Sequence, residues 1–297
     1  MRDPQKQANL ARRSALFRAI REFFYRHGFL EVETPVKIHA PAPEEYIESV
    51  QAEGDFLRTS PELAMKGMLA DGFERIFQIG SCFRAGEFGR KHREEFTMLE
   101  FYAVRMGYRE LARFTAALIA EAARDLSGGE TLRYRGETIH LGDFEFLTVR
   151  EAFQRYAGAM VEEAERCDCF DEWMVTKIEP QLGRGKLTFL CDYPADRASL
   201  ARLRADDPSV AERWELYIAG IELGNAFGEL TDPAEQKARF RAALEFRAKA
   251  GMHPYPEPVE FFDALDRGLP QSSGCAMGLD RLCMIFCDAD DIAQVRA

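Results

Sequence analysis

The sequence predicts a single α+β domain whose strands are mostly antiparallel. Short apolar strands flank tight turns, as at Leu132–Tyr134 and Thr138–His140, and long amphipathic helices lie apart from them in the chain. No internal repeat, low-complexity linker or clear domain boundary interrupts residues 1–297. Helices packed on an antiparallel sheet account for this arrangement.

Helices are predicted where apolar residues recur at helical spacing. The first covers Ala8–His27 and has a long apolar stripe. A second begins at Ser60-Pro61-Glu62, with serine as N-cap, proline at the first helical position and an early carboxylate. The other predicted helices are Tyr108–Leu126, Val149–Tyr156, Phe170–Ile178, Pro233–Gly251 and Leu282–Phe286.

Strands are predicted where short apolar runs end at turn residues. Besides the hairpin that turns at Arg135-Gly136, two strands flank a tight turn near Ala219-Gly220. Pro41-Ala-Pro43 marks a loop. The remaining predicted strands are Phe29–Val32, Arg75–Phe83, a run that starts at Phe96, and Leu187–Cys191.

Composition excludes several classes of protein. The chain is 46% apolar and 30% charged, which is typical of globular domains. It has no run long enough to span a membrane and no apolar signal core at its start. The seven cysteines form no Cys-x-x-Cys pair, so we expect reduced thiols in a cytoplasmic protein rather than disulfides or a zinc site. The net charge of −11 argues against a large nucleic-acid surface but leaves local basic patches open.

The segment Arg84–Tyr102 is the most informative in the chain. Arg84 follows an apolar strand, and a polar loop with further cations leads into a second apolar strand. Strand alternation places Met98, Glu100 and Tyr102 on one face of that second strand. A carboxylate there is costly to desolvate unless a cation meets it. Taken alone, the segment would also fit a hairpin with a solvated loop and an exposed Glu100.

Five segments, in this order, resemble the class II aminoacyl-tRNA synthetases, and within them the catalytic core of lysyl-tRNA synthetase. The segment Arg84–Tyr102 is similar to motif 2. The other four are Gly28–Pro35 (motif 1), Thr59–Glu62, Glu222–Glu229 and Gly278–Arg281 (motif 3). The resemblance extends from about Ala8 to the end of the chain. It implies an antiparallel sheet flanked by helices and a homodimer formed through motif 1.

The same resemblance implies an ATP site. Forming an adenylate requires fixed cations around the α-phosphate. Arg84 would bridge that phosphate and the substrate carboxylate, and Arg281 would hold the triphosphate. Phe96 would stack under adenine, and His92 would lie near the terminal phosphates. The alternative for Arg281 is an ordinary ion pair with Asp280.

Adenine recognition departs from the family pattern. Motif 2 usually reads Phe-Arg-x-Glu, whereas this chain reads Phe83-Arg84-Ala85-Gly86-Glu87. Either Glu87 takes over through a shifted loop, or the backbone alone recognises adenine.

Glu215 and Glu222 predict a metal site without help from the family. They lie on two strands joined by a tight turn, and either register makes them direct or near cross-strand neighbours. Like charges placed in this way repel each other. Mg²⁺ would remove the penalty while bridging nucleotide phosphates. The alternative is that both side chains point into solvent.

The predicted amino-acid pocket suits a substrate with two ammonium groups. Glu62, Glu100 and Glu229 are carboxylates in separate apolar or glycine-rich segments. By resemblance, Glu229 and Tyr102 would bind the side-chain ammonium and Glu62 the other amine, while Glu100 and Asn225 would support them. Buried unpaired carboxylates are costly, so this pocket implies a dication-like ligand.

Two positions predict which branch of the family the chain resembles. Ser60 and Ala276 match truncated paralogues that attach (R)-β-lysine to a lysine of translation elongation factor P, where lysyl-tRNA synthetases usually have alanine and glycine. One methylene changes binding by about 1–3 kcal/mol, which gives a preference for β-lysine over lysine. No anticodon-binding module precedes motif 1, so tRNA is disfavoured as acceptor. The alternatives are a lysine-activating ligase for tRNA or a carrier protein, and a non-catalytic amino-acid-binding paralogue.

Overall fold

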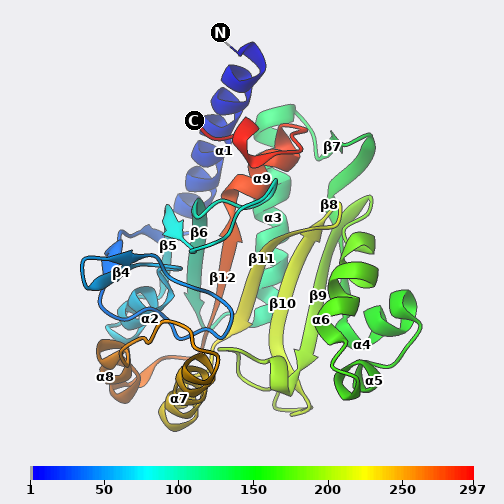
Figure 1. The fold of residues 1–297 in the computed structure, drawn as a ribbon. Helices are drawn as coiled ribbons and strands as arrows, with labels where there is room; N and C mark the ends of the chain where they lie inside the picture. Colours follow the sequence, from blue (N-terminus) through cyan, green and yellow to red (C-terminus); the bar gives the residue numbers. More distant parts are fainter. Residues whose placement is uncertain (1–2) are drawn as a thin grey trace.

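A nine-stranded sheet forms the centre of the computed structural model, which describes residues 3–297 (Figure 1). Neighbouring strands are antiparallel except β1 with β5 and β8 with β9, so the predicted α+β class and mostly antiparallel pairing are confirmed. In spatial order the strands are β1 (Leu30–Glu31), β5 (Arg75–Phe83), β6 (Glu95–Val104), β12 (Ser272–Gly278), β11 (Ile221–Gly228), β10 (Val210–Ile218), β9 (Lys186–Pro194), β8 (Glu137–Thr148) and β7 (Thr131–Tyr134).

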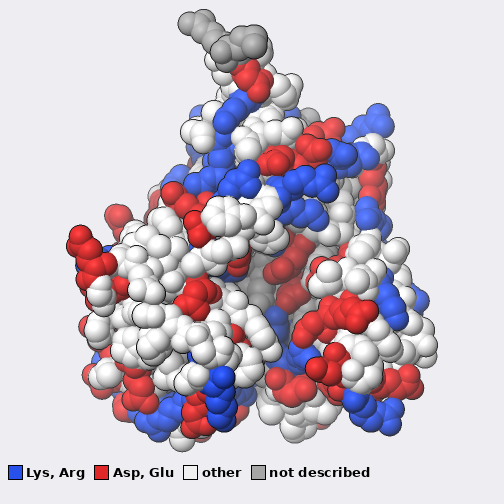
Figure 2. Space-filling view, in the orientation of Figure 1, with Lys and Arg blue, Asp and Glu red and all other residues white. Residues whose placement is uncertain are grey.

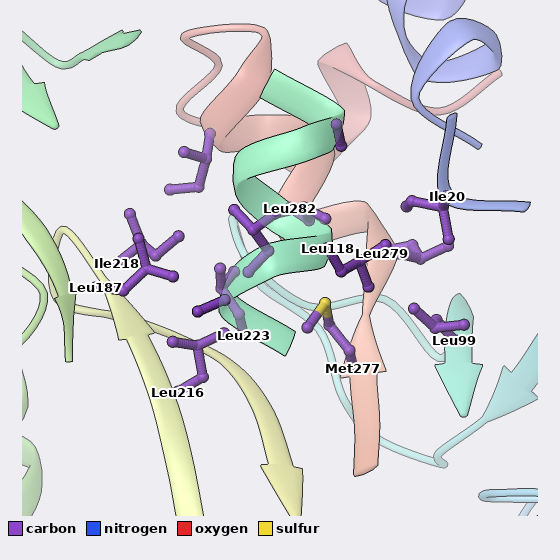
Figure 3. Close-up of a cluster of buried hydrophobic side chains, with 14 of the residues drawn as sticks. Ile20, Leu99, Leu118, Leu187, Leu216, Ile218, Leu223, Met277, Leu279 and Leu282 are labelled. Carbon is purple, nitrogen blue, oxygen red and sulfur yellow. The ribbon is translucent and has the colours of Figure 1, made fainter. Parts of the chain in front are cut away.

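One face of this sheet is covered by α1 (Pro4–Arg26), α3 (Tyr108–Ser127) and α9 (Leu279–Phe286). Strand alternation sends apolar side chains to this face, where they form the main core. Figure 3 shows Leu118 of α3 and Leu282 of α9 converging with Leu223 and Met277 of the sheet. The opposite face is left for the polar residues of the same strands.

The opposite face of the sheet lies between two groups of shorter helices (Figure 1). On one side are α2 (Glu62–Ala70), α7 (Pro233–Lys249), α8 (Val259–Gly268) and a small sheet of β2 (Lys37–Ile38), β4 (Asp55–Leu57) and β3 (Gln51–Ala52). On the other side are α4 (Val149–Ala152), α5 (Val161–Arg166) and α6 (Phe170–Trp173). Three single turns of 3₁₀ helix lie at Glu179–Gln181, Ala195–Arg197 and Ile292–Gln294.

Several predicted element boundaries change in the structure. The helices expected at Val149–Tyr156 and Phe170–Ile178 each pass from α into π geometry, at Phe153–Ala157 and Met174–Ile178. Pro61, not Ser60, is the N-cap of α2, although the Ser60 hydroxyl accepts a bond from the Glu62 N–H at 3.0 Å. The predicted strand Phe29–Val32 is found as β1, whereas α8 and the small sheet of β2, β3 and β4 were not predicted. Strands of two or three residues show too few periods of their pattern.

The expectation that all cysteines are reduced is wrong for one pair. Cys167 and Cys169 form a disulfide, with Cα atoms 5.3 Å apart. The intervening Asp168 has a φ of 53°, so the turn between α5 and α6 brings the two side chains together. The other five cysteines are free. None of the helices formed by residues 3–297 has the length and apolar character needed to cross a membrane.

Candidate active site

A cavity of about 1100 Å³ opens on the polar face of the sheet between the two helix groups. Figure 2 shows the molecule hollowed there, with acidic side chains along the wall. Eleven of the fourteen predicted site residues line this cavity. They are Ser60, Glu62, Arg84, Glu87, His92, Phe96, Glu215, Glu222, Asn225, Ala276 and Arg281. Residues that are up to 221 positions apart in the chain are therefore brought to one cavity.

Arg84 stands at the end of β5 with its guanidinium over the ring of Phe96, 5.1 Å from the centroid. Its backbone N–H donates to the Glu94 carbonyl at 2.8 Å, which closes the β5–β6 hairpin. Its Nε is buried and has no hydrogen-bond partner among the described residues, and the Glu87 carboxylate is 3.8 Å from Nη1. An orphaned buried donor in a cavity fits an anionic ligand such as phosphate or carboxylate.

Gly86 explains why the usual glutamate is absent from this hairpin. Its φ is +76°, a conformation that residues with a Cβ rarely adopt. Its N–H donates to a carboxylate oxygen of Glu94 at 2.9 Å, which holds the turn. Glu87 follows and lines the cavity, and its role in adenine recognition stays a prediction.

Arg281 lies in the first turn of α9 and contacts two other predicted residues. Its Nη1 donates to the Glu222 carbonyl at 2.9 Å, and its Nη2 lies 2.6 Å from Nε2 of His92. Burial and the charge of Arg281 lower the pKa of His92, so neutral His92 accepts the bond from the guanidinium. The alternative pairing of Arg281 with Asp280 is not observed. Asp280 instead accepts a bond from Arg296 at 2.8 Å and pairs with Arg13 of α1.

Glu215 and Glu222 share the cavity face but are diagonal rather than directly opposed. Glu215 faces Asn225 and Glu222 faces Tyr217, because the register shifts after Leu216. Arg213 and Tyr217 each donate a hydrogen bond to Glu215, at 2.6 and 2.7 Å. Burial and the charge of Glu215 raise the pKa of Glu222 to about 7. No cluster of three or more metal-binding side chains occurs within residues 3–297, but two carboxylates of like charge in one cavity fit Mg²⁺.

Lys66 is a buried residue next to the cavity that sequence reasoning missed. It is fully buried on α2, with Nζ 2.5 Å from a carboxylate oxygen of Glu62 and 2.5 Å from one of Glu229. Burial alone would lower the pKa of Lys66, but the two carboxylates outweigh this effect and raise it. Lys66 carries one positive charge against these two carboxylates and so compensates part of their charge, while the inference of a dication-like ligand stays a prediction. The available signal was the four-residue spacing of Glu62 and Lys66 on one helix.

Glu100, Tyr102 and Glu229 lie beneath the cavity floor rather than in its lining. Ser60 and Tyr102 each donate a hydrogen bond to Glu100, both at 2.6 Å, and burial raises the pKa of Glu100 to about 8. Gly274 covers this layer, since a Cβ there would lie 2.2 Å from the Tyr102 ring and 2.7 Å from Glu229. The three residues are thus connected to the cavity through Ser60 and Glu62.

Ala276 of β12 stands between two predicted pocket residues. It faces Asn225 of β11 on one side and Glu100 of β6 on the other. Its methyl group lines the cavity, and Arg213 donates to the Asn225 side chain at 3.3 Å. The position is therefore suited to influence how a ligand's amine is placed.

The sequence profile of the tRNA synthetases of class II (D, K and N) matches residues 1–297, and the chain belongs to this family. Its curated relatives are ligases. It is 36% identical to the lysine–tRNA ligase of Thiobacillus denitrificans over 97% of this chain and 63% of that protein. It is 37% identical to the elongation factor P–(R)-β-lysine ligase of Yersinia enterocolitica over 98% of this chain and 94% of that protein. The Yersinia pestis ligase of the same name is 36% identical over the same shares.

The two groups of relatives differ in the length that this chain matches. The chain spans about 63% of the lysine–tRNA ligase and 94% of the elongation factor P ligase. The expected resemblance to the lysine branch of the class II family, including its elongation factor P ligases, is therefore confirmed.

Proposed function

We propose that this protein is an AMP-forming ligase that activates (R)-β-lysine or lysine with ATP and transfers it to a lysine ε-amine of translation elongation factor P. The observation that carries the proposal is a single cavity that joins Arg84 and Arg281 to the Ser60–Glu62 end of an amine-binding network. The 94% match to a ligase named for this reaction supports the choice of acceptor.

The nucleotide would occupy the end of the cavity that holds Arg84, Arg281, His92 and Phe96. A planar guanidinium matches two oxygens at once, so both arginines suit the triphosphate and the developing charge at the α-phosphate. Glu215 and Glu222 would hold Mg²⁺. When bound, this ion neutralises phosphate charge.

The amino acid would occupy the end of the cavity between Ser60, Glu62, Asn225 and Ala276. The Glu62 carboxylate already forms an ion pair with Lys66. A ligand ammonium bound next to Glu62 would therefore share this carboxylate with the Lys66 ammonium. Glu229 and Tyr102 are buried beneath the floor of the cavity. A ligand could therefore contact them only if Lys66 or Gly274 shifted. Ser60 would distinguish amine positions directly, because its hydroxyl lines the cavity and donates to Glu100.

We further propose a cytoplasmic homodimer that associates through the motif 1 edge. The apolar stripe of α1 is used within the chain, since Leu16, Ile20 and Phe24 are fully buried. However, β1 is the edge strand of the large sheet, and its Leu30 is 51% exposed. An unpaired strand edge with an exposed leucine is a ready surface for a second copy. Light scattering at micromolar concentration tests this, and a monomeric mass would contradict it.

The decisive experiment has two parts. ATP–pyrophosphate exchange compares lysine with (R)-β-lysine, with and without Mg²⁺. Mass spectrometry then follows purified elongation factor P mixed with enzyme, ATP and the better substrate. We expect exchange that needs Mg²⁺ and a mass gain of one lysyl unit on the factor. Charging of lysine tRNA with the factor unmodified would favour the tRNA ligase alternative, to which the 36% identical lysine–tRNA ligase points.

A further inference from the structure

Glu44 is a carboxylate of the cavity wall that none of the motifs includes. It lies in the loop between β2 and β3, is half-buried, and lines the cavity together with Ser60, Glu62 and Arg84. Within residues 3–297, no hydrogen bond or ion pair reaches its carboxylate. Glu62 and Glu215, by contrast, are each held by a cation, Lys66 and Arg213. Glu44 is therefore a carboxylate without a partner among the described residues, in the cavity that Arg84 also lines.

The loop that carries Glu44 is held in place from two sides. Arg247 of α7 is 1% exposed and donates through Nη1 to the carbonyls of Glu44 and Ile47, both at 2.9 Å. Its Nη2 donates to the Glu48 carboxylate at 2.7 Å. The Glu48 carbonyl in turn accepts the N–H of Ala85, the residue after Arg84, at 2.8 Å. Glu44 is thus fixed relative to the motif 2 hairpin before any ligand binds.

The surroundings of Glu44 suit proton transfer near neutral pH. Burial raises its pKa to about 7, and the charges of Glu62 on α2 and Glu87 of the β5–β6 loop act in the same direction. Arg84 and Arg213 of β10 oppose this rise. Both protonation states are therefore populated at pH 7, the condition under which a general base is most effective.

We propose that Glu44 is the general base that deprotonates the attacking lysine amine in the transfer half of the reaction, an inference that rests on the proposed function. The ε-ammonium of free lysine is almost wholly protonated near pH 7 and cannot attack. Glu44 takes one proton from it. The neutral nitrogen then bonds to the carbonyl carbon of the aminoacyl-adenylate. As the carbon–oxygen bond to phosphate breaks, AMP leaves with that electron pair, and its phosphate takes the second proton lost by the nitrogen.

The test separates activation from transfer in the full-length chain. Glu44→Gln is compared with the wild type and with Glu53→Gln, which removes an exposed carboxylate from the turn between β3 and β4, outside the cavity. Activation is measured by ATP–pyrophosphate exchange and by trapping the adenylate with hydroxylamine, a nucleophile that is already neutral near pH 7. Transfer is measured by mass spectrometry on elongation factor P and, in parallel, on N-acetyl-lysine amide.

We expect Glu44→Gln to keep exchange and hydroxylamine trapping within about twofold while lowering transfer at pH 7 by roughly 100-fold or more. The wild-type transfer rate should level off above pH 7, where Glu44 is ionised. The residual rate of the variant should instead keep rising with pH, because it depends on the small fraction of lysine amine that is already neutral. Glu53→Gln should behave like the wild type.

Other outcomes overturn the inference in recognisable ways. Wild-type transfer rates in Glu44→Gln would show that another group takes the proton. A raised KM for lysine in exchange, with transfer from the adenylate unchanged, would make Glu44 an amino-acid-binding residue instead. If the wild type modifies N-acetyl-lysine amide but not elongation factor P, the proposed acceptor is wrong. The role of Glu44 as general base is then judged from the transfer rates to N-acetyl-lysine amide. If the wild type transfers to neither amine, both proposals fail.

Discussion

Two cations at and next to the cavity, Arg84 and Lys66, differ in how their buried nitrogens are partnered within the chain. At the Arg84 end, a buried guanidinium nitrogen has no partner among the described residues. At the Lys66 end, a fully buried ammonium is held by two carboxylates, each at 2.5 Å. The Arg84 nitrogen is left for a ligand to bind, whereas the Lys66 ammonium already has its carboxylate partners within the chain. The comparison teaches that a buried nitrogen of one cation can be left without a partner at the cavity while another cation, buried outside its lining, is paired within the fold.

Lys66→Met should give the largest effect on stability. It leaves Glu62 and Glu229 buried without their cation, and breaking a buried pair typically costs about 3–5 kcal/mol. Urea unfolding measures the change, with Lys249→Met as a control, because Lys249 has an 80% exposed side chain. Adding Glu229→Gln should recover part of the loss. A loss no larger than that of the control would show that Lys66 is not the internal counterion.

Arg84→Ala should do the opposite, sparing stability and removing activity. Its Nε makes no hydrogen bond that the variant would lose within the described residues. Loss of a donor aimed at developing charge costs about 100- to 1000-fold in rate. Pyrophosphate exchange and urea unfolding are measured on the same preparation. Destabilisation as large as that of Lys66→Met would erase the distinction between the two ends.

Glu100→Gln should change how stability depends on pH. The pKa of Glu100 is raised from 4.5 to about 8, so between these values the folded state keeps a proton that the unfolded state loses. Stability from this group is present at low pH and falls as pH rises through that window, by at most about 1.4 kcal/mol per pH unit. The variant should flatten this slope in urea unfolding between pH 5 and pH 8. An unchanged slope would mean that Glu100 is ionised when buried.

Ala276→Gly should give the smallest effect, a change of preference without loss of fold. Removing the methyl between Asn225 and Glu100 should shift preference from (R)-β-lysine towards lysine by about 10- to 200-fold. Relative kcat/KM in pyrophosphate exchange measures the shift. An unchanged ratio would remove this position from the specificity argument.

Prediction from the sequence worked best where the signal was local. The strand Arg75–Phe83 and the turn at Ala219-Gly220 are found where alternation and turn residues placed them. The fold class followed from the same signals. By contrast, the register shift after Leu216, which makes Glu215 and Glu222 diagonal, depends on how two strands pair and leaves no mark in either strand.

The sequence by itself determined the class of fold, the family and a set of candidate site residues, because periodicity, turn residues and motif order are properties of the chain. Only the tertiary structure showed that Lys66 pairs with two of the predicted carboxylates and that Glu229 lies beneath the floor. It also showed that the Glu44 carboxylate, on the cavity wall, has no partner within residues 3–297. Whether a carboxylate is paired or free depends on which distant side chain reaches it. That distance is set by packing between segments, and the linear order of residues does not contain it.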